Sequence, residues 1–336
     1  MSLRSIFLTL LILLVLCSAG ALYLFNYYTE QFTFNSTAKV VEIQKGESVT
    51  KISKKLYDKK VIFNDKLFVL YVKINNLESG LKAGEYEFDK ELTIKNVTDK
   101  LIKGDVKLRK ITIPEGLTLK EIAQIFERNK LFSASKFMAL LDDKSFQEEL
   151  LGNDIGSFEG YLFPETYHYG KDVTAKEFIK IMVQMHNKVF SELKPHYSGE
   201  NNLSDYEILK LASIIEKESG AGSELTTISS VFHNRLRIGM KLDSDPTIIY
   251  GMGDRYDGNI RKRDIEQYTE YNTYHIPGLP PTPISNPGKA ALHAAMNPDE
   301  TQFLYFVSMG NGTHYFSKSY KDHQRAVYNY QIRKRN

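Results

Sequence analysis

The sequence has a single cysteine and little net charge, and both features limit the classes of protein to which the chain can belong. Cys17 lies within an apolar run near the N-terminus, so the rest of the chain forms no internal disulfide and cysteine does not identify the compartment. The formal net charge of +3 is small for 336 residues, and no arginine-rich stripe is present. We therefore expect no nucleic-acid partner.

The short motifs of several enzyme classes are also missing. The sequence has no HExxH and no CxxC pattern, and the histidines of its C-terminal third are scattered without ligand spacing, which argues against a zinc site. No serine stands in a nucleophile-elbow context. Gly251 and Gly253 lack the strand–glycine–helix context of a nucleotide loop. We predict no metal ion and no cofactor.

What is present is typical of a globular protein of two or three domains. Charged residues make up 25% and hydrophobic residues 42% of the chain. We expect an α+β fold in three parts. These are a cytoplasmic tip and transmembrane helix (1–28), a small LysM-like α/β module (38–104), and a mixed α/β catalytic domain with a carboxylate-bearing helix (105–336).

An apolar run begins close to the N-terminus. Residues 6–25 are uncharged, leucine-rich and long enough to span a bilayer. Arg4 precedes the run, and tyrosines gather at its far end, as at a membrane interface. Residues 19–21 resemble a signal-peptide cleavage site, but the run continues past them, and bulky Leu16 disfavours lipidation of Cys17. We predict an uncleaved single-pass anchor with a cytoplasmic N-terminus and the remaining chain outside.

The next segment predicts a small module. Periodicity favours a strand over 39–43, a helix capped by Ser48, a helix over 61–72, a strand over 83–88 and a helix over 93–102. Lys45-Gly46-Glu47-Ser48, the helix after it and Asn75-Asn76-Leu77 resemble a LysM module, the small fold that binds GlcNAc-containing glycans. A structural role for the module is the alternative.

A helix is predicted to begin at residue 204 and to carry one carboxylic acid, Glu218, in its last turn. Ser204 and Glu207 form a capping-box pattern, and apolar residues then recur at helical spacing along one face. Glu218 falls on that face in the last turn, directly before Gly220 and Gly222. The apolar face therefore predicts a buried glutamic acid at a helix end.

Two effects disfavour the ionised form of Glu218: burial and the negative end of the helix dipole. Raising a glutamate pKa to between 6 and 7 requires roughly 3 kcal/mol, and a helix terminus supplies about 1 kcal/mol or less, so burial has to be the larger effect. Such a group would act as a general acid. The alternative is a solvated glutamate paired with Arg235 or Arg237.

Several later segments are candidates for a substrate cleft. Residues 157–169 interleave aromatics with acids, which suits a sugar-binding wall containing Glu165 or, alternatively, a packed loop with Glu165 in solvent. Helices are predicted over 172–193 and 224–238, and turn-rich segments follow between 243 and 287. A strand over 303–308 is expected to pair with residues 315–316. The candidate substrate-binding residues are Glu165, Asn234, Asp245, Thr247, Tyr271 and Asn272.

Several of these motifs occur in the order found in one bacterial family. The chain resembles the endolytic murein transglycosylases (YceG-like family) at Gly160–Thr166, Leu211–Glu218, Val231–Leu236, Asp245–Gly251, Tyr271–Tyr274, Gly278–Pro281 and Tyr305–Val307. The similarity extends from the apolar N-terminal run to near the C-terminus. In that family the second glutamate of the Glu-Lys-Glu run is the catalytic acid, which falls on Glu218.

The resemblance implies a lyase that cleaves the MurNAc–GlcNAc bond within nascent peptidoglycan strands and ends their growth. One carboxyl group protonates the glycosidic oxygen and then accepts the proton of the MurNAc C6 hydroxyl, which gives a 1,6-anhydro-MurNAc end. The implied location is the bacterial inner membrane with the catalytic domain periplasmic or extracytoplasmic. The implied partners are glycan strands, membrane-bound synthases and the division and elongation machinery.

Two other functions remain open on the sequence. One is a non-catalytic scaffold that binds peptidoglycan through the LysM-like module and recruits cell-wall synthases. The other is a hydrolytic muramidase, which normally needs two carboxylates and would use Asp245 beside Glu218.

Overall fold

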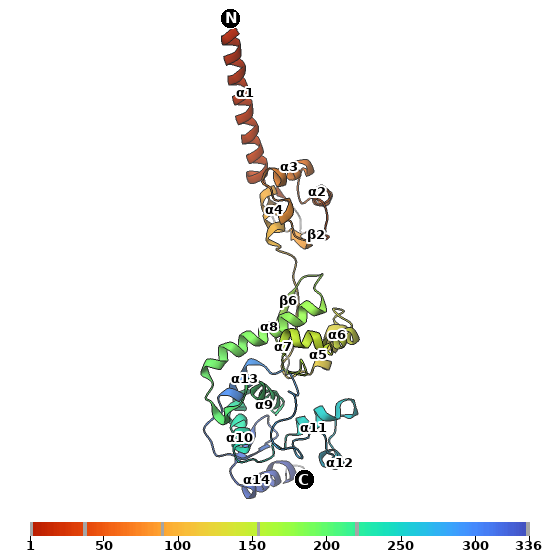
Figure 1. The fold of residues 1–336 in the computed structure, drawn as a ribbon, viewed down its shortest axis with the longest axis vertical. Helices are drawn as coiled ribbons and strands as arrows, with labels where there is room; N and C mark the ends of the chain where they lie inside the picture. The colour runs from red at the N-terminus through yellow and green to blue at the C-terminus, as the bar shows by residue number, and fades with distance from the viewer. Residues whose placement is uncertain (1–2, 36–38, 89–90, 153–154, 219–221, 334–336) are drawn as a thin grey trace. The chain divides into compact units, whose positions relative to one another are not determined.

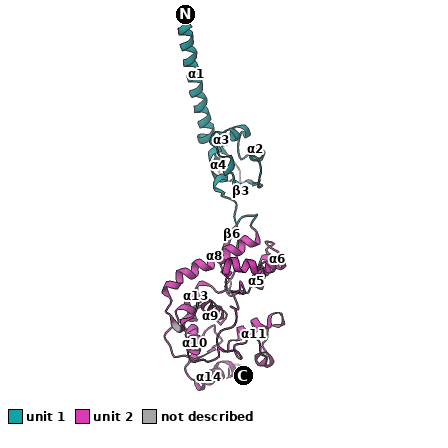
Figure 2. Cartoon of the chain, in the orientation of Figure 1, with its two compact units in different colours: residues 1–110, 168–173 teal, residues 111–167, 174–336 magenta. Residues whose placement is uncertain are grey.

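The computed structural model describes residues 3–35, 39–88, 91–152, 155–218 and 222–333 of the chain. Figure 1 shows the order of its helices and strands. The chain forms two compact units, coloured separately in Figure 2: residues 1–110 with 168–173, and residues 111–167 with 174–336. Both units mix helices with short strands, so the coarse α+β prediction is confirmed. The finer division into anchor, LysM-like module and catalytic domain stays a prediction.

The first unit begins with the predicted apolar helix. α1 (Leu3–Asn26) continues as one π-helical turn, Tyr27–Gln31, and none of the side chains of α1 is buried. Residues 3–31 are long and apolar enough to cross a membrane. Length and composition fit either an anchor or a signal sequence.

A small module follows α1 in the same unit. β2 (Lys39–Ile43) pairs antiparallel with β3 (Gly84–Phe88), and between them lie α2 (Val49–Asp58) and α3 (Asp65–Ile74). α4 (Ile94–Lys103) completes the module, and β1 (Phe34–Asn35) pairs with β4 (Glu91–Leu92). Side chains of β2, β3 and all three helices form one hydrophobic core.

The caps of this module explain its helix boundaries. Ser48 accepts a hydrogen bond from the Lys51 amide, as the sequence predicts. The second helix begins at Asp65, later than the predicted residue 61, because the Asn64 side chain caps it by accepting from the Leu67 amide. The apolar residues at 61 and 62 are buried in the turn before the helix.

The second unit is mostly helical. Its elements in chain order are β5 (Arg109–Thr112, shared with the first unit), α5 (Leu119–Arg128), α6 (Ala134–Leu141), α7 (Lys144–Leu151), β6 (Thr166–Tyr169, likewise shared), α8 (Ala175–Leu193), α9 (Asp205–Glu218), α10 (Leu225–Arg237), α11 (Asp245–Met252), α12 (Lys262–Glu266), α13 (Lys289–Met296), β7 (Tyr305–Ser308), β8 (His314–Ser317) and α14 (Tyr320–Val327). β5 pairs with β6, and β7 with β8. Phe306 lies opposite Phe316, so the predicted C-terminal hairpin is confirmed.

α9 is the central helix of this unit. It packs against α13, α10 and α11, and seven of its residues from Ile208 to Ile215 are buried. Ser204 and Glu207 form the predicted capping box, with the Ser204 hydroxyl 2.7 Å from the Glu207 carboxylate and the Glu207 amide 3.3 Å from Ser204 Oγ. The helix is described up to Glu218, and Gly220 lies outside the described residues.

Two segments differ from the sequence prediction. Residues 245–252, predicted as turns, form α11, because Pro246 at its first turn fits the helix start and Ile248 packs into the core. The aromatic residues at 158, 161 and 163 are buried in the protein interior and do not line a cleft. Glu165 is exposed, so this segment is the packed loop with a solvated glutamate.

Candidate active site

Glu218, the last residue of α9, lines a pocket of about 420 Å³. The pocket gathers side chains from α9, α10, the start of α11, β7 and α14, including Arg235, Asp245, Tyr274, Tyr305 and His323. Glu218 itself is partly buried. Motifs far apart in the sequence therefore meet around the acid that the sequence singles out.

Among the described residues, Ser244 is the hydrogen-bond partner of the Glu218 carboxyl group. The Ser244 hydroxyl donates to Glu218 Oε1 at 2.6 Å. The pKa of Glu218 is raised to about 7, chiefly by burial and also by the charge of Asp245, against the hydrogen bond from Ser244 and the Arg235 guanidinium, which lower it. The group is therefore poised to hold or release a proton near neutral pH.

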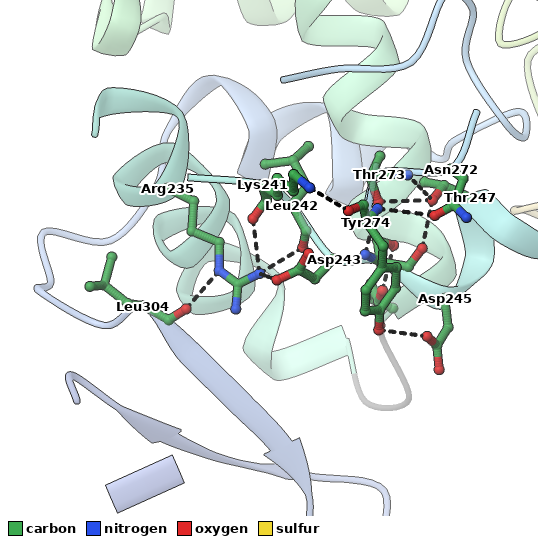
Figure 3. A network of polar contacts seen from close by, with 12 residues as sticks. Arg235, Lys241, Leu242, Asp243, Asp245, Thr247, Asn272, Thr273, Tyr274 and Leu304 are labelled. Atoms are coloured by element: carbon green, nitrogen blue, oxygen red, sulfur yellow. Dashed lines mark hydrogen bonds and ion pairs between the residues drawn. The ribbon is translucent and has the colours of Figure 1, made fainter. Parts of the chain in front are cut away.

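Ser244 is held by a buried threonine pair, part of which Figure 3 shows. Its amide donates to Thr273 Oγ1 at 2.9 Å, and its carbonyl accepts from Thr247 Oγ1 at 2.6 Å. The two threonine hydroxyls are 2.9 Å apart, and both side chains are fully buried. Thr247 therefore supports the residue that contacts Glu218 and does not itself face the pocket.

Arg235 places a fixed positive charge in the pocket (Figure 3). Its side chain donates to three backbone carbonyls, those of Leu304, Lys241 and Leu242, at 2.7–3.2 Å. Its Nη1 atom also lies 3.4 Å from the Asp243 carboxylate. The guanidinium carbon lies 5.4 Å from the centre of the Tyr305 ring. These contacts hold Arg235 in one place, and within the described residues no ion pair joins it to Glu218.

Asp245 is another carboxyl group of the pocket, which Asp243 also lines. It is exposed and accepts a hydrogen bond from the Tyr274 hydroxyl at 2.8 Å (Figure 3). The Tyr274 pKa is raised, chiefly by burial and then by the charge of Asp245. The structure thus brings Asp245 and Glu218 together and adds Tyr274, a residue of the Tyr271–Tyr274 motif that was not among the predicted site residues.

Aromatic side chains form one wall of the pocket. Tyr305 from β7 lies 5.8 Å from Tyr320 and 5.2 Å from His323, both of which belong to α14, measured between ring centres. Tyr320 is 59% exposed, so its ring is available to a ligand. Sequence reasoning placed the aromatic wall near residue 161, whereas the structure places it at the C-terminal end.

The other predicted substrate-binding residues lie outside this pocket. Asn234 lines a different cavity of about 630 Å³ and donates to the carbonyls of Thr301 and Phe303. Asn272 is fully buried, and its side-chain amide donates to the carbonyls of Ile265 and Gln267. Both side chains hold loops of the second unit in place.

Tyr271 and Glu165 are also away from Glu218. The Tyr271 hydroxyl lies 2.9 Å from Thr282 Oγ1, and its ring packs on Tyr250 with ring centres 4.8 Å apart. The exposed Glu165 carboxylate accepts from the amide of Thr166. The structure thus gives neither residue a place in the Glu218 pocket.

Glu159 is a buried acid that the sequence reasoning did not single out. Its carboxyl group accepts hydrogen bonds from the Leu119 amide, the Asn286 side chain at 3.0 Å and the Tyr250 hydroxyl at 3.0 Å. Burial raises its pKa to about 8, against these hydrogen bonds, which lower it. Tyr250 belongs to α11, the helix that carries Asp245, so Glu159 anchors the far end of that helix.

The last turn of α9 is fastened by its own polar side chains. Glu216 Oε2 accepts from the Gly288 amide at 3.0 Å, and Lys217 Nζ donates to the Gly116 carbonyl at 3.1 Å. One turn earlier, Ser213 Oγ accepts from the Ile284 amide at 3.0 Å. These contacts fix the orientation from which Glu218 enters the pocket. In the part of the chain that the structure describes, no group of three His, Cys, Asp or Glu side chains is arranged to hold a metal ion.

Two bacterial transglycosylases are similar to this chain over most of its length. It is 34% identical to an endolytic murein transglycosylase of Bacillus subtilis, over 88% of this chain and 86% of that protein. It is 30% identical to an endolytic murein transglycosylase of Streptococcus pneumoniae, over 96% of this chain and 65% of that protein.

A solved structure and a family model give the same result. A crystal structure of a YceG-like protein from Listeria monocytogenes matches with a TM-score of 0.58 at 34% identity, covering 86% of this chain and 99% of that one. The model of the YceG-like family matches residues 41–329, which include Glu218 and most of the N-terminal module. The chain therefore belongs to the YceG-like family.

Proposed function

We propose that this protein is a membrane-anchored endolytic lytic transglycosylase. Its substrate would be peptidoglycan, and it would cleave the MurNAc–GlcNAc bond within nascent strands. The observation that carries the proposal is the Glu218 carboxyl group, which is partly buried, has a pKa of about 7, and is hydrogen-bonded to Ser244 within a pocket. The names of the relatives support the same activity.

In the first step of the proposed mechanism Glu218 acts as general acid. Its proton passes to the oxygen between MurNAc C1 and GlcNAc, the C1–O bond breaks, and the GlcNAc-containing fragment leaves with a new hydroxyl group. Glu218 is then a carboxylate, which the Ser244 hydroxyl and the Arg235 charge both stabilise. A raised but not extreme pKa suits this exchange, because the group must both give and accept a proton.

In the second step Glu218 acts as general base. The carboxylate accepts the proton of the MurNAc C6 hydroxyl as that oxygen bonds to C1, which closes the 1,6-anhydro ring and restores the neutral acid. No water is consumed. A single carboxyl group suffices, whereas a hydrolase normally needs two.

The remaining pocket residues would position the glycan. Tyr305 and Tyr320 offer aromatic faces on which a pyranose ring can stack, and the Asp245–Tyr274 pair offers hydrogen-bonding groups at the pocket edge. We place Thr247, Tyr271, Asn272, Asn234 and Glu165 outside direct substrate contact, because their side chains are buried in loop contacts or lie away from the pocket.

The N-terminal unit would localise the enzyme. α1 would cross the bacterial inner membrane with its N-terminus in the cytoplasm, which leaves the catalytic unit on the side where peptidoglycan is made. The β2–α2–α3–β3 module would bind glycan as a LysM-like fold. Membrane-bound synthases and the division and elongation machinery would be its neighbours, because they produce the nascent strands.

Mass spectrometry of the products tests this proposal. Peptidoglycan treated with the full-length protein in detergent should gain anhydro-MurNAc ends, and Glu218→Gln should abolish them. Ser229→Ala is the matched control, because Ser229 is fully buried on neighbouring α10 and its hydroxyl has no hydrogen-bond partner among the described residues.

The other two functions predict different results in the same assay. Undiminished anhydro ends with Glu218→Gln would contradict the assigned role. Reducing MurNAc ends would instead indicate a hydrolase that uses Asp245, an exposed carboxylate in the pocket. No cleavage by the wild type, with binding retained, would favour the scaffold.

A further inference from the structure

One face of α3 exposes a mixed apolar and basic stripe. Leu70 is 47% and Ile74 57% exposed, and Lys66 and Lys73 are exposed beside them. These positions recur at intervals of three and four residues, so they lie on one side of the helix. The other side, with Phe68, Tyr71 and Val72, is buried in the core of the module.

α3 is joined by packing to the end of the apolar helix α1. The Phe25 ring in the last turns of α1 stacks on Tyr71 of α3, with ring centres 6.3 Å apart. Beyond α1, Tyr28 and Phe32 pack on Phe63, directly before α3, at 6.0 and 4.8 Å. Figure 1 shows α3 beside this end of α1. Side-chain contacts therefore hold the module against the C-terminal end of α1.

The same end of α1 has the composition of a membrane interface. Tyr23, Tyr27 and Tyr28 are exposed there, and tyrosine side chains prefer the headgroup level of a bilayer. Phe25 lies within one helical turn of Tyr28. If these tyrosines lie at the headgroups, the C-terminal turn of α3 lies at nearly the same depth, because Tyr71 contacts Phe25.

We infer that the exposed face of α3 rests on the membrane surface and binds acidic phospholipids. Leu70 and Ile74 would enter the headgroup region, and Lys66 and Lys73 would contact the lipid phosphates. Asp65, at the first position, is the only acidic residue of α3, so the helix carries a net positive charge. This inference rests on the proposed membrane insertion of α1.

The function of such a contact would be orientation. A single spanning helix leaves the attached module free to rotate and tilt, whereas a second contact at the surface restricts both movements. The module, proposed to bind glycan, would then stay at a fixed height above the bilayer, where nascent glycan strands are made.

The sequence contains no tryptophan, so one introduced tryptophan reports its own surroundings. Leu70→Trp and Ile74→Trp would be made in the full-length protein, reconstituted into vesicles of phosphatidylcholine and phosphatidylglycerol. The vesicles would contain lipids brominated near the headgroup end of their acyl chains. Emission at 70 and 74 should fall roughly twofold, since interfacial helices bury their apolar face in that region.

Two further variants serve as controls. Leu14→Trp lies in the middle of α1 and should be quenched by lipids brominated deeper in the chain, which reports insertion of α1 itself. Val40→Trp lies on β2, which Figure 1 draws at the other end of the module from α1, and should not be quenched. Circular dichroism spectra identical to the wild type would show that each variant folds.

Each outcome decides between the two proposals. Quenching at 14 with none at 70 and 74 overturns the membrane contact while the anchor stands, and leaves the face in water for a protein partner. Equal quenching at 40 and 74 also overturns it, because the module then has no fixed orientation. No quenching at 14 removes the anchor and this inference with it, without bearing on the chemistry of Glu218.

The lysines give a separate readout. The double variant Lys66→Glu, Lys73→Glu, made in the Ile74→Trp background, should lose most of the quenching in vesicles that contain phosphatidylglycerol. Unchanged quenching would show that lysine–phosphate contacts do not hold the face. Wild-type quenching should also be weaker in vesicles of phosphatidylcholine alone.

Discussion

Replacing Glu218 by glutamine should stabilise the protein at neutral and alkaline pH while it abolishes activity. The ordinary pKa of a glutamate is 4.5, and burial raises that of Glu218 to about 7. At about 1.4 kcal/mol per pH unit, this difference corresponds to about 3 kcal/mol of stability. Water at the pocket mouth reduces that figure, so we expect a gain of about 2–3 kcal/mol.

The direction in which the free energy of unfolding changes with pH follows from proton binding. Between pH 4.5 and about 7 the folded protein holds the Glu218 proton and the unfolded chain does not. The free energy of unfolding therefore falls as the pH rises through this window, and the loss is complete above the folded pKa. Glutamine is neutral at every pH, so the variant avoids the loss. The difference between variant and wild type should grow from pH 4 to pH 8.

Urea unfolding of the full-length protein in detergent at pH 4, 6 and 8 measures this difference. Glu165→Gln is the matched control, since it removes the same charge from an exposed position and should give a much smaller dependence on pH. A Glu218→Gln variant whose advantage is constant with pH, or shrinks toward pH 8, would refute the reasoning. The carboxyl group would then not be held in its neutral form by burial.

Three other changes test a partner of Glu218 and two buried polar side chains away from the pocket. Ser244→Ala removes the donor to Glu218 Oε1, and a hydrogen bond to a charged group contributes roughly 1.5–3 kcal/mol, so the alkaline limb of the pH–rate profile should move up by about one to two pH units. Ser229→Ala should leave the limb in place, and an unmoved limb in Ser244→Ala would contradict the assignment. Asn272→Ala should destabilise the protein by about 2–4 kcal/mol in urea unfolding, because it leaves buried carbonyls without donors; a loss below about 1 kcal/mol would show that water replaces the amide. The pKa of buried His186 is lowered from 6.5 to about 4, so wild-type stability should fall by roughly 3 kcal/mol as the pH falls through this window. His186→Phe should lose that pH dependence in the same urea assay. An equal loss of stability in acid for both proteins would contradict the role given to His186.

The main helix and its acid could be predicted because their signals are local. A capping box fixes the start of α9, and the spacing of apolar residues fixes which side is buried, so the position of Glu218 follows by counting. The partner of Glu218 could not be found in this way. Ser244 is 26 residues away and belongs to a turn, and its hydroxyl reaches Glu218 only because Thr247 and Thr273 hold that turn.

The predicted substrate-binding residues show where prediction from motifs is weak. Asn234, Thr247 and Asn272 occur in motifs that resemble the family, and such motifs suggest contact with substrate. In the structure their side chains bond to backbone carbonyls or to other buried groups. Long irregular loops contain many backbone groups that need partners, and polar side chains in the loops or on the helices beside them supply these partners. Sequence alone does not separate that role from binding.

The raised pKa of Glu218 depends on the rigidity of the turn that carries it. A carboxyl group at a helix end can escape burial by a small rotation of the last turn toward water. Glu216 and Ser213 bond to the segment before α13, and Lys217 bonds to the segment before α5, so such a rotation would break several hydrogen bonds together. Each of these contacts contributes about 1 kcal/mol, and together they offset the cost of keeping Glu218 in the pocket. The protonation state of the proposed catalytic acid therefore depends on side chains that bond to loops and not to its carboxyl group, and loosening them should lower its pKa toward 4.5.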